Sequence, residues 1–339
     1  MIEKIPFIIA EMSGNHNQSL ERALAIVDAA ADAGVDAVKI QTYTADTMTI
    51  DIDRGEFSIS DKDSLWKGET LYHLYEKAHT PWEWHTAIFE RCKERGIMGF
   101  STPFDDTSVD FLEDLGVPCY KIASFENVDL PLIRKVARTG KPIIASTGMT
   151  TVAELSDLVQ TVRKNGCTDL TLLKCTSSYP ASPEGTNLRT IPHMRELFSC
   201  AVGLSDHTLG IGAAVASVAL GAAVIEKHFT LSRAEGGVDA AFSLEPAEMA
   251  QLVRECRTAA LALGAVSYER AEQEQKSLQF RRSLYVVEDM KAGDVFTEKN
   301  LRRIRPGMGL SPKYYDIILG KKANCNITRG TAVQWDLIE

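Results

Sequence analysis

The sequence has no long run of apolar residues. A membrane-spanning helix needs about 20 of them and the apolar core of a secretory leader about 7–15. The first apolar segment of this 339-residue chain, IPFII, is shorter than either, and Glu11 follows it closely. We therefore expect no membrane span, no secretory leader and a cytoplasmic protein.

The chain also lacks paired cysteines and clustered basic residues. Its seven cysteines are an odd number, widely scattered and without a CxxC pair, which indicates reduced thiols. The net charge is −9 and no Lys/Arg cluster of the nucleic-acid-binding type occurs, so we expect no nucleic-acid partner. With 45% hydrophobic and 24% charged residues, the composition is that of an ordinary globular protein.

One alternation of strand-like and helix-like segments runs through the first part of the chain. Eight short apolar runs that become polar at their ends alternate with amphipathic helical patterns: FIIAEMS, AVKIQTY, MGFSTPF, CYKIAS, PIIASTG, LTLLKCTSS, AVGLSDH and VIEKHFTL. Eight parallel strands with helical crossovers favour a closed α/β barrel, the TIM or (β/α)8 fold. We predict this barrel over residues 1–268, a linker over 269–283 and a small domain over 284–339. The segment from about 44 to 80 is predicted to be a long loop over the barrel mouth.

Polar side chains gather where these strands end. In a (β/α)8 barrel the active site lies at the carboxyl ends of the strands, so we expect a polar pocket there. Two lysines and several hydroxyl groups are suited to hold a phosphate or carboxylate: Lys39, Lys121, Ser124, Ser146, Ser177 and Ser205. The alternative is that the lysines pair with carboxylates such as Glu11 and Glu226.

His207 and His228 follow neighbouring strands at equivalent positions. Two imidazoles placed in this way can bind one divalent cation and leave positions for water and substrate, although a single strand-end histidine is more often structural. Asp206 and Glu226 stand beside them and could orient the rings. For Glu226, direct contact with reacting groups is the alternative role. Strand alternation places Glu226 and His228 on one face and Lys227 on the other, so we expect Lys227 to be structural.

The segments IIAEMSGNHNQS, VKIQTY, STPFD, YKIAS, IASTGM, CTSSYP, GLSDHT, IEKHFTL and RRSLYVVEDMKAGDVFTEKNLRRIRPGMG occur in this order. Together they resemble the sialic acid synthase family, in which a (β/α)8 barrel precedes an antifreeze-like (SAF) domain. The resemblance implies an enzyme that condenses phosphoenolpyruvate with an N-acetylated amino sugar. It also implies a divalent metal, usually Mn²⁺ with Mg²⁺ or Co²⁺ as alternatives, bound by His207 and His228.

The same resemblance assigns roles to further residues. It implies that Lys39, Lys121, Gln41, Thr102, Ser124, Ser146 and Ser205 contact phosphate and pyruvate. It implies that Asp239 and Tyr179 contact the sugar. Arg305 matches the arginine that the SAF domain contributes to the partner subunit's site, which implies a domain-swapped homodimer.

Two departures from the family pattern bear on mechanism and substrate. Asn17 stands where N-acetylneuraminate synthases have a glutamate thought to act in catalysis, and Ser177 stands where they have an asparagine. The segment GGVDAAFSLEP, with Ala240, Ala241 and Phe242, resembles the pseudaminic acid branch of the family, and apolar side chains suit a sugar without a 6-hydroxyl. Neuraminate or legionaminate synthesis is the alternative, and a non-catalytic sugar-binding module is a more remote one.

Overall fold

The computed structural model describes residues 5–60 and 65–339 of the chain. The chain divides into two compact units, one ending at Gly264 and the other formed by Ala265–Glu339. This division lies close to residue 268, where the sequence predicts the barrel to end. Among the described residues, no helix has both the length and the apolar composition needed to cross a bilayer.

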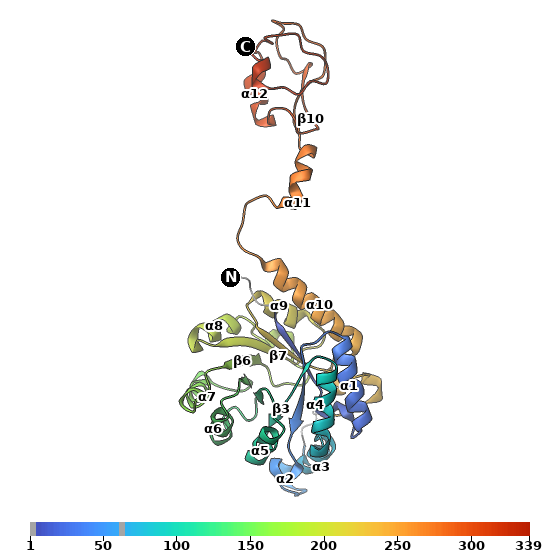
Figure 1. Ribbon diagram of the computed structural model, residues 1–339, viewed down its shortest axis with the longest axis vertical. Helices are drawn as coiled ribbons and strands as arrows, with labels where there is room; N and C mark the ends of the chain where they lie inside the picture. Colours follow the sequence, from blue (N-terminus) through green and yellow to red (C-terminus); the bar gives the residue numbers. More distant parts are fainter. Residues whose placement is uncertain (1–4, 61–64) are drawn as a thin grey trace. The chain divides into compact units, whose positions relative to one another are not determined.

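The first unit is a closed barrel of parallel strands in sequence order, as the sequence predicts (Figure 1). The strands are β1 (Phe7–Glu11), β2 (Ala37–Thr42), β3 (Met98–Pro103), β4 (Tyr120–Ile122), β5 (Ile143–Ser146), β6 (Leu170–Cys175), β7 (Ala201–Asp206) and β8 (Val224–His228). Pairing of β1 with both β2 and β8 closes the barrel. Each of the eight apolar runs became a strand, although each strand ends before its polar tail does.

Helices surround the strands. They are α1 (Leu20–Asp32), α4 (His85–Glu94), α5 (Asp106–Asp114), α6 (Leu130–Arg138), α7 (Val152–Lys164), α8 (Thr190–Phe198), α9 (Gly212–Ala219) and α10 (Pro246–Leu263). Local signals fix their ends: Thr151 and Glu154 form a capping box at the start of α7. Gly34 ends the turn after α1 with φ +85°, a left-handed conformation that glycine adopts without steric cost.

The insertion between β2 and β3 is more ordered than the loop predicted there. It contains α2 (Ala45–Met48) and α3 (Leu71–Ala78), which pack against one another (Figure 1). Residues 61–64 of the predicted loop lie outside the described residues.

Apolar side chains fill the amino-terminal half of the barrel interior. Ile9, Phe100, Leu173 and Val224 form one buried cluster inside the barrel, and a larger cluster lies between the strands and the helices. The carboxyl ends of the strands are therefore left for polar groups, as in other barrels of this type.

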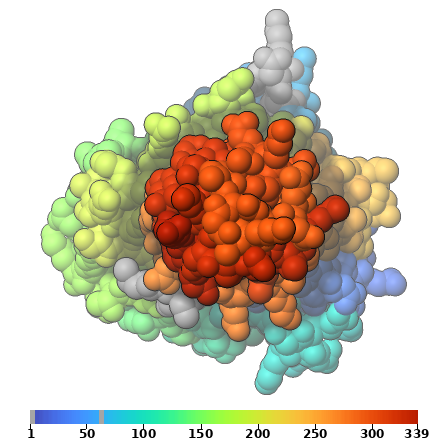
Figure 2. All heavy atoms as spheres, turned by 90° about the horizontal axis from the view of Figure 1, so that it is seen from above, coloured from blue at the N-terminus to red at the C-terminus, as the bar shows by residue number. Residues whose placement is uncertain are grey.

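The second unit has its own core. Strands β9 (Ser283–Val286) and β10 (Leu301–Ile304) pair antiparallel, and α11 (Glu272–Gln275) and α12 (Tyr315–Ile318) are short. Leu284, Phe296, Leu301 and Val333 are fully buried in its centre. Figure 2 shows this unit, in orange and red, as one compact group of atoms.

Candidate active site at the barrel mouth

A cavity of about 580 Å³ opens at the carboxyl ends of the strands. This volume lies within the range of about 300–1,000 Å³ that is usual for small-molecule sites. Most of the predicted site residues line it, namely Lys39, Gln41, Lys121, Ser124, Ser146, Ser177, Tyr179, Ser205, His207, Glu226, His228 and Asp239. These residues come from six of the eight strands or the loops after them, and Glu11 of β1 and Phe104 after β3 bring the other two strands to the same cavity.

Three predicted residues are not part of this lining. Thr102 is fully buried beneath it and accepts a hydrogen bond from Lys39 Nζ at 3.2 Å. Asn17 is exposed, has a left-handed backbone (φ 49°) and donates a hydrogen bond to the carbonyl of Gly236. Arg305 is an exposed residue of the second unit.

Two lysines and two glutamates form the floor of the cavity. Lys39 Nζ lies 2.5 Å from Glu11 Oε2 and 3.7 Å from Glu226 Oε2, and Lys121 Nζ lies 3.9 Å from Glu226 Oε1. The pairing that the sequence left as an alternative is thus present, and it occurs within the cavity lining itself. We call Glu11, Lys39, Lys121 and Glu226 the charged floor.

The protonation of the charged floor depends on its burial. Burial raises the pKa of Glu11 to about 7 and outweighs the opposing effect of Lys39. Burial alone would also raise the pKa of Glu226, but Lys121 and Lys39 hold it below its usual value. Near neutral pH, Glu11 is therefore the carboxyl group of the floor that can take up a proton, and the floor then gains one positive charge.

Hydroxyl groups surround the lysines. Lys121 Nζ donates to Ser146 Oγ at 2.6 Å, and Ser205 Oγ donates to Glu226 Oε1 at 3.0 Å. Gly148 allows the loops after β4, β5 and β6 to converge, because a Cβ atom there would lie 2.0 Å from Ser177 Oγ and 2.8 Å from Ser124 Oγ. The Gly148 amide donates to Ser124 Oγ at 3.1 Å.

The two histidine rings lie side by side, with centroids 5.4 Å apart. Nδ1 of His207 lies 2.9 Å from the carbonyl oxygen of Thr176. This backbone contact occupies Nδ1 and not Nε2. Nδ1 of His228 is buried and has no hydrogen-bond partner among the described residues. Burial lowers the pKa of His228 well below its usual value, and the nearby cations add to this effect, so its ring stays neutral.

The acidic neighbours of the histidines do not orient the rings. Asp206 accepts hydrogen bonds from Thr208 and forms an ion pair with Lys227 at 2.7 Å. Glu226 bonds to Ser205, as described above, and its contacts are with the two lysines. The ring-orienting role expected for Asp206 and Glu226 has no contact to support it among the described residues, because strand alternation turns Asp206 away from the cavity and Glu226 toward the floor.

Tyr179 and Asp239 complete one side of the cavity. The Tyr179 ring lies 4.4 Å from His207 and 5.1 Å from Phe242 between centroids. Burial raises the pKa of the Asp239 carboxyl, which accepts a hydrogen bond from the Gly14 amide at 3.4 Å. Ala240 and Phe242 are only 2% exposed, and the cavity lining within the described chain includes neither, so they pack behind the site.

Several lining residues were missed by sequence reasoning as candidates. Glu126, two residues after Ser124, lines the cavity, and its Oε2 atom is buried without a hydrogen-bond partner among the described residues. Burial raises its pKa to about 7. A carboxylate so close behind a predicted strand end is a signal that could have identified it. The apolar lining from the insertion after β2, including Trp66 and Tyr75, carried no such signal.

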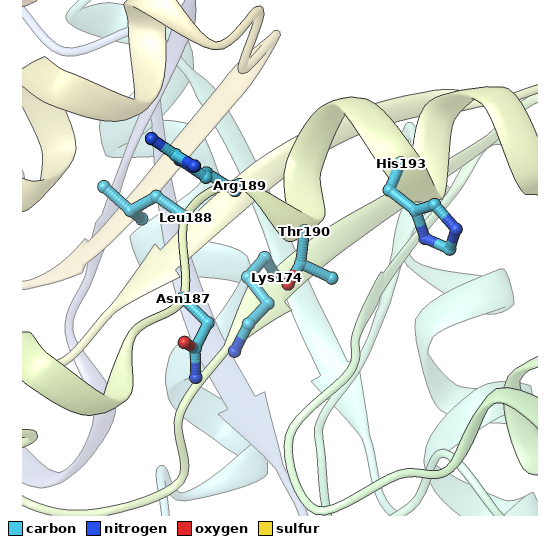
Figure 3. Close-up of a pocket in the computed structure, with 6 residues that line it drawn as sticks. All are labelled: Lys174, Asn187, Leu188, Arg189, Thr190 and His193. Carbon is cyan, nitrogen blue, oxygen red and sulfur yellow. The ribbon is translucent and has the colours of Figure 1, made fainter.

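A second depression, of about 590 Å³, lies beside β6 and the start of α8 (Figure 3). Its lining includes Lys174, Asn187 and His193 and none of the predicted site residues. Lys174 Nζ donates to the carbonyl of Cys175 at 2.8 Å. This depression therefore has no part in the chemistry predicted from the sequence.

The chain matches two family models. The NeuB family model matches residues 26–268 and the SAF domain model matches residues 281–339. A solved N-acetylneuraminic acid synthetase from Leptospira borgpetersenii, crystallised with citrate, superposes with a TM-score of 0.72 at 32% identity and covers 82% of this chain and 92% of its own.

Curated relatives align over nearly the whole length. A pseudaminic acid synthase of Campylobacter jejuni is 46% identical over 332 residues, covering 98% of this chain and 96% of the relative. One of Helicobacter pylori is 42% identical over 338 residues, covering 98% of each. These matches and the closed barrel with its polar mouth show that this chain is an enzyme of the NeuB family with a carboxyl-terminal SAF domain.

Proposed function

We propose that this enzyme condenses phosphoenolpyruvate with 2,4-diacetamido-2,4,6-trideoxy-L-altrose and water, giving pseudaminic acid and phosphate. The observation that carries the proposal is the 46% identity to a pseudaminic acid synthase over 98% of this chain. The charged floor and its ring of hydroxyl groups support it, because phosphoenolpyruvate is an anion and the aldehyde oxygen of the sugar becomes negatively charged during the reaction.

In the proposed reaction, carbon 3 of phosphoenolpyruvate attacks the aldehyde of the open-chain sugar. Water adds to carbon 2, and the resulting tetrahedral centre expels phosphate by cleavage of its C–O bond. Lys39 and Lys121 hold the phosphate and carboxylate groups, with Ser124, Ser146 and Ser205 as further donors. Gln41, Thr102 and Ser177 complete this set, in which Thr102 acts through Lys39.

Glu11 and Glu226 set the charge that the substrates meet. Because the pKa of Glu11 lies near 7, uptake of one proton leaves the floor cationic while Glu226 stays ionised. Such a change favours an incoming anion without moving either lysine. This arrangement supports a role for Glu226 on the floor rather than beside the metal.

His207 and His228 fit a divalent metal, for which we propose Mn²⁺, with Mg²⁺ or Co²⁺ as alternatives. The buried Nδ1 of His228 has no partner among the described residues, its ring is neutral, and the His207 ring lies beside it. The described residues contain no group of three or more His, Cys, Asp or Glu side chains that could hold a metal, so substrate and water would complete the coordination. When bound, such an ion stabilises negative charge on the aldehyde oxygen.

The group that handles protons is not the one found in neuraminate synthases. Asn17 replaces that glutamate, and an amide side chain cannot act as a base at this position. Glu126 is the better candidate in this chain, because it lines the cavity and its pKa lies near 7. We propose that Asn17 only positions substrate, and that Tyr179 and Asp239 contact the sugar.

Arg305 is proposed to act on the sugar bound by a second copy of the chain, in a domain-swapped homodimer. Its exposure on the second unit supports this role. Cytoplasmic localisation stays a prediction from the lack of a long apolar run, and the unpaired cysteines agree with it.

The test is phosphate release from phosphoenolpyruvate with a panel of sugars. We expect turnover with 2,4-diacetamido-2,4,6-trideoxy-L-altrose and much less with N-acetylmannosamine or the legionaminic acid precursor. Preference for either of the latter would replace the proposed substrate within the same family. Sugar binding without phosphate release from any member of the panel would instead favour the non-catalytic binding module.

A further inference from the structure

One wall of the cavity is apolar and comes from a single insertion. Met48, Ile59, Trp66, Leu71, Leu74 and Tyr75 all lie between β2 and β3, and all line the cavity above the charged floor. We call these six residues the apolar wall. Sequence analysis assigned Ala240, Ala241 and Phe242 to the sugar methyl group, but none of the three lines the cavity. Phe242 packs against Tyr179 and His228, Ala240 is buried and Ala241 is exposed.

The apolar wall is fixed in place by hydrogen bonds. Trp66 Nε1 donates to the carbonyl of Val238 at 3.0 Å, which joins the insertion to the loop after β8. The Trp66 ring also lies 6.3 Å from that of Tyr179. The amide of Ile59 donates to the Glu69 carbonyl, and the Ile59 carbonyl accepts from the Gly68 amide, both at 2.9 Å. The wall therefore has a defined position relative to the residues that hold the reacting groups.

The wall leaves apolar surface facing the cavity. Ile59, Trp66, Leu71 and Tyr75 are half-buried and line the cavity. Half-buried apolar side chains that line a concave site favour a ligand group that removes their surface from water. The wall is thus suited to an apolar ligand group.

The charged floor and the apolar wall are suited to different ends of the sugar. Phosphoenolpyruvate and the aldehyde need the charged floor and the two histidines, His207 and His228. The far end of the open-chain sugar must then meet the other lining. Six apolar side chains offer no hydrogen-bond acceptor or donor except Tyr75 OH and Trp66 Nε1, and the latter is bonded to Val238.

We propose that the apolar wall is the specificity surface for the deoxygenated, methyl-terminated end of the sugar. This inference rests on the proposed function and deepens it. A 6-hydroxyl group placed against the wall would lose its bonds to water and meet only Tyr75 OH in their place, whereas a methyl group would gain contact. Discrimination of this kind in an apolar pocket is about 10–100-fold.

The experiment compares two sugars that differ only at carbon 6. These are 2,4-diacetamido-2,4,6-trideoxy-L-altrose and its 6-hydroxy counterpart, each assayed by phosphate release at saturating phosphoenolpyruvate. For the wild type we expect kcat/KM to favour the deoxy sugar by about 10–100-fold. Trp66→Ala, Ile59→Ala and Leu71→Ala should each reduce that ratio, mainly by lowering kcat/KM for the deoxy sugar.

Control variants separate the wall from its anchoring. Ile50→Ala removes an apolar side chain of the same insertion that is 54% exposed and outside the cavity lining, and it should keep the wild-type ratio. Trp66→Phe keeps an aromatic surface but loses the bond to Val238, so it should retain more selectivity than Trp66→Ala. The melting temperature of each variant identifies any that fail to fold, and Ile59→Ala and Leu71→Ala keep the test open if Trp66→Ala does so.

The outcomes distinguish this inference from the proposed function. No turnover with any diacetamido sugar would overturn the proposed function. Turnover of both sugars at equal kcat/KM by the wild type would overturn the role of the wall and leave the proposed function intact. Folded wall variants that lose activity equally toward both sugars would also overturn the role of the wall and leave the proposed function intact. That result would indicate a general structural role of the wall or a contact with another copy of the chain.

Discussion

Neighbouring residues of β8 belong to two buried charge clusters that differ in how completely they are satisfied. Lys227 forms an ion pair with Asp206 and donates to the Thr208 carbonyl, with side-chain exposures of 0% and 1% for the pair. Glu226, one residue earlier, belongs to the charged floor. Its Oε2 atom is buried without a hydrogen bond among the described residues and lies 3.7 Å from Lys39 Nζ.

The difference indicates that the Lys227–Asp206 pair stabilises the barrel, whereas the charged floor is suited to bind a ligand. A buried ion pair whose hydrogen bonds are complete has nothing left to offer a substrate, and loss of one partner leaves an uncompensated charge. An incomplete cluster costs stability in the free enzyme and is found where a ligand completes it. The following four changes test this comparison.

The largest effect is expected for the histidines that accompany Glu226 on the cavity side. His207→Ala or His228→Ala should reduce turnover by about 10³-fold or more, because several kcal/mol of charge stabilisation by the metal is lost. Titration calorimetry should show weakened Mn²⁺ binding while the melting temperature changes little. His193→Ala, outside the barrel mouth, is the matched control. Full activity of the His228 variant in a chelator would remove the metal assignment.

Lys227→Met should act on stability. Leaving Asp206 buried and unpaired is expected to lower the free energy of unfolding by about 3–5 kcal/mol. Urea unfolding followed by circular dichroism measures the loss. The double variant Asp206→Asn, Lys227→Met removes the unpaired charge and keeps an acceptor for Thr208, so it should recover part of the loss. A stable but inactive Lys227→Met enzyme would contradict the structural role.

Lys39→Met should have the opposite profile. We expect kcat/KM for phosphoenolpyruvate to fall by about 10²–10³-fold, as for removal of one donor to a developing anion. The stability loss should be smaller than for Lys227→Met, because Glu11 has a pKa near 7 and can become neutral when its partner is removed. Lys174→Met, also on a barrel strand but outside the mouth, is the control and should keep activity.

The smallest effect concerns the pH dependence of stability at Glu126. Its pKa in the folded state is raised from 4.5 to about 7, so its contribution to stability is fully present below pH 4.5 and is lost as the pH rises through 7. Glu126→Gln removes this loss. At pH 8 the variant should be more stable relative to wild type than at pH 5, by about 1–3 kcal/mol. Exposed Glu90→Gln is the control, and equal differences at both pH values would exclude the burial effect.

Much of the fold, and the position of the site at the carboxyl ends of the strands, could be predicted from the sequence. The strands were found because each combines an apolar run with a polar end, and the histidines because they follow neighbouring strands at equivalent positions. Strand alternation also placed Glu226 and His228 toward the cavity and Lys227 away from it, as the contacts of Lys227 now confirm. Glu126, Ile59 and Trp66 were missed, since residues outside regular helices and strands carry no period that indicates which way they point. Leu71, Leu74 and Tyr75 were missed because the period of a short helix such as α3 does not show which distant residues it faces.

Local sequence patterns were enough to predict the barrel and the gathering of polar residues at one end of it, because hydrophobic periodicity is a local property of each segment. The tertiary structure decided which distant groups meet. Trp66 and Val238, 172 residues apart, are bonded only because the insertion returns to the loop after β8. Closure of the barrel likewise buries Glu11 between Lys39 and Glu226, and this burial, which no local pattern encodes, sets the proton affinity of the charged floor.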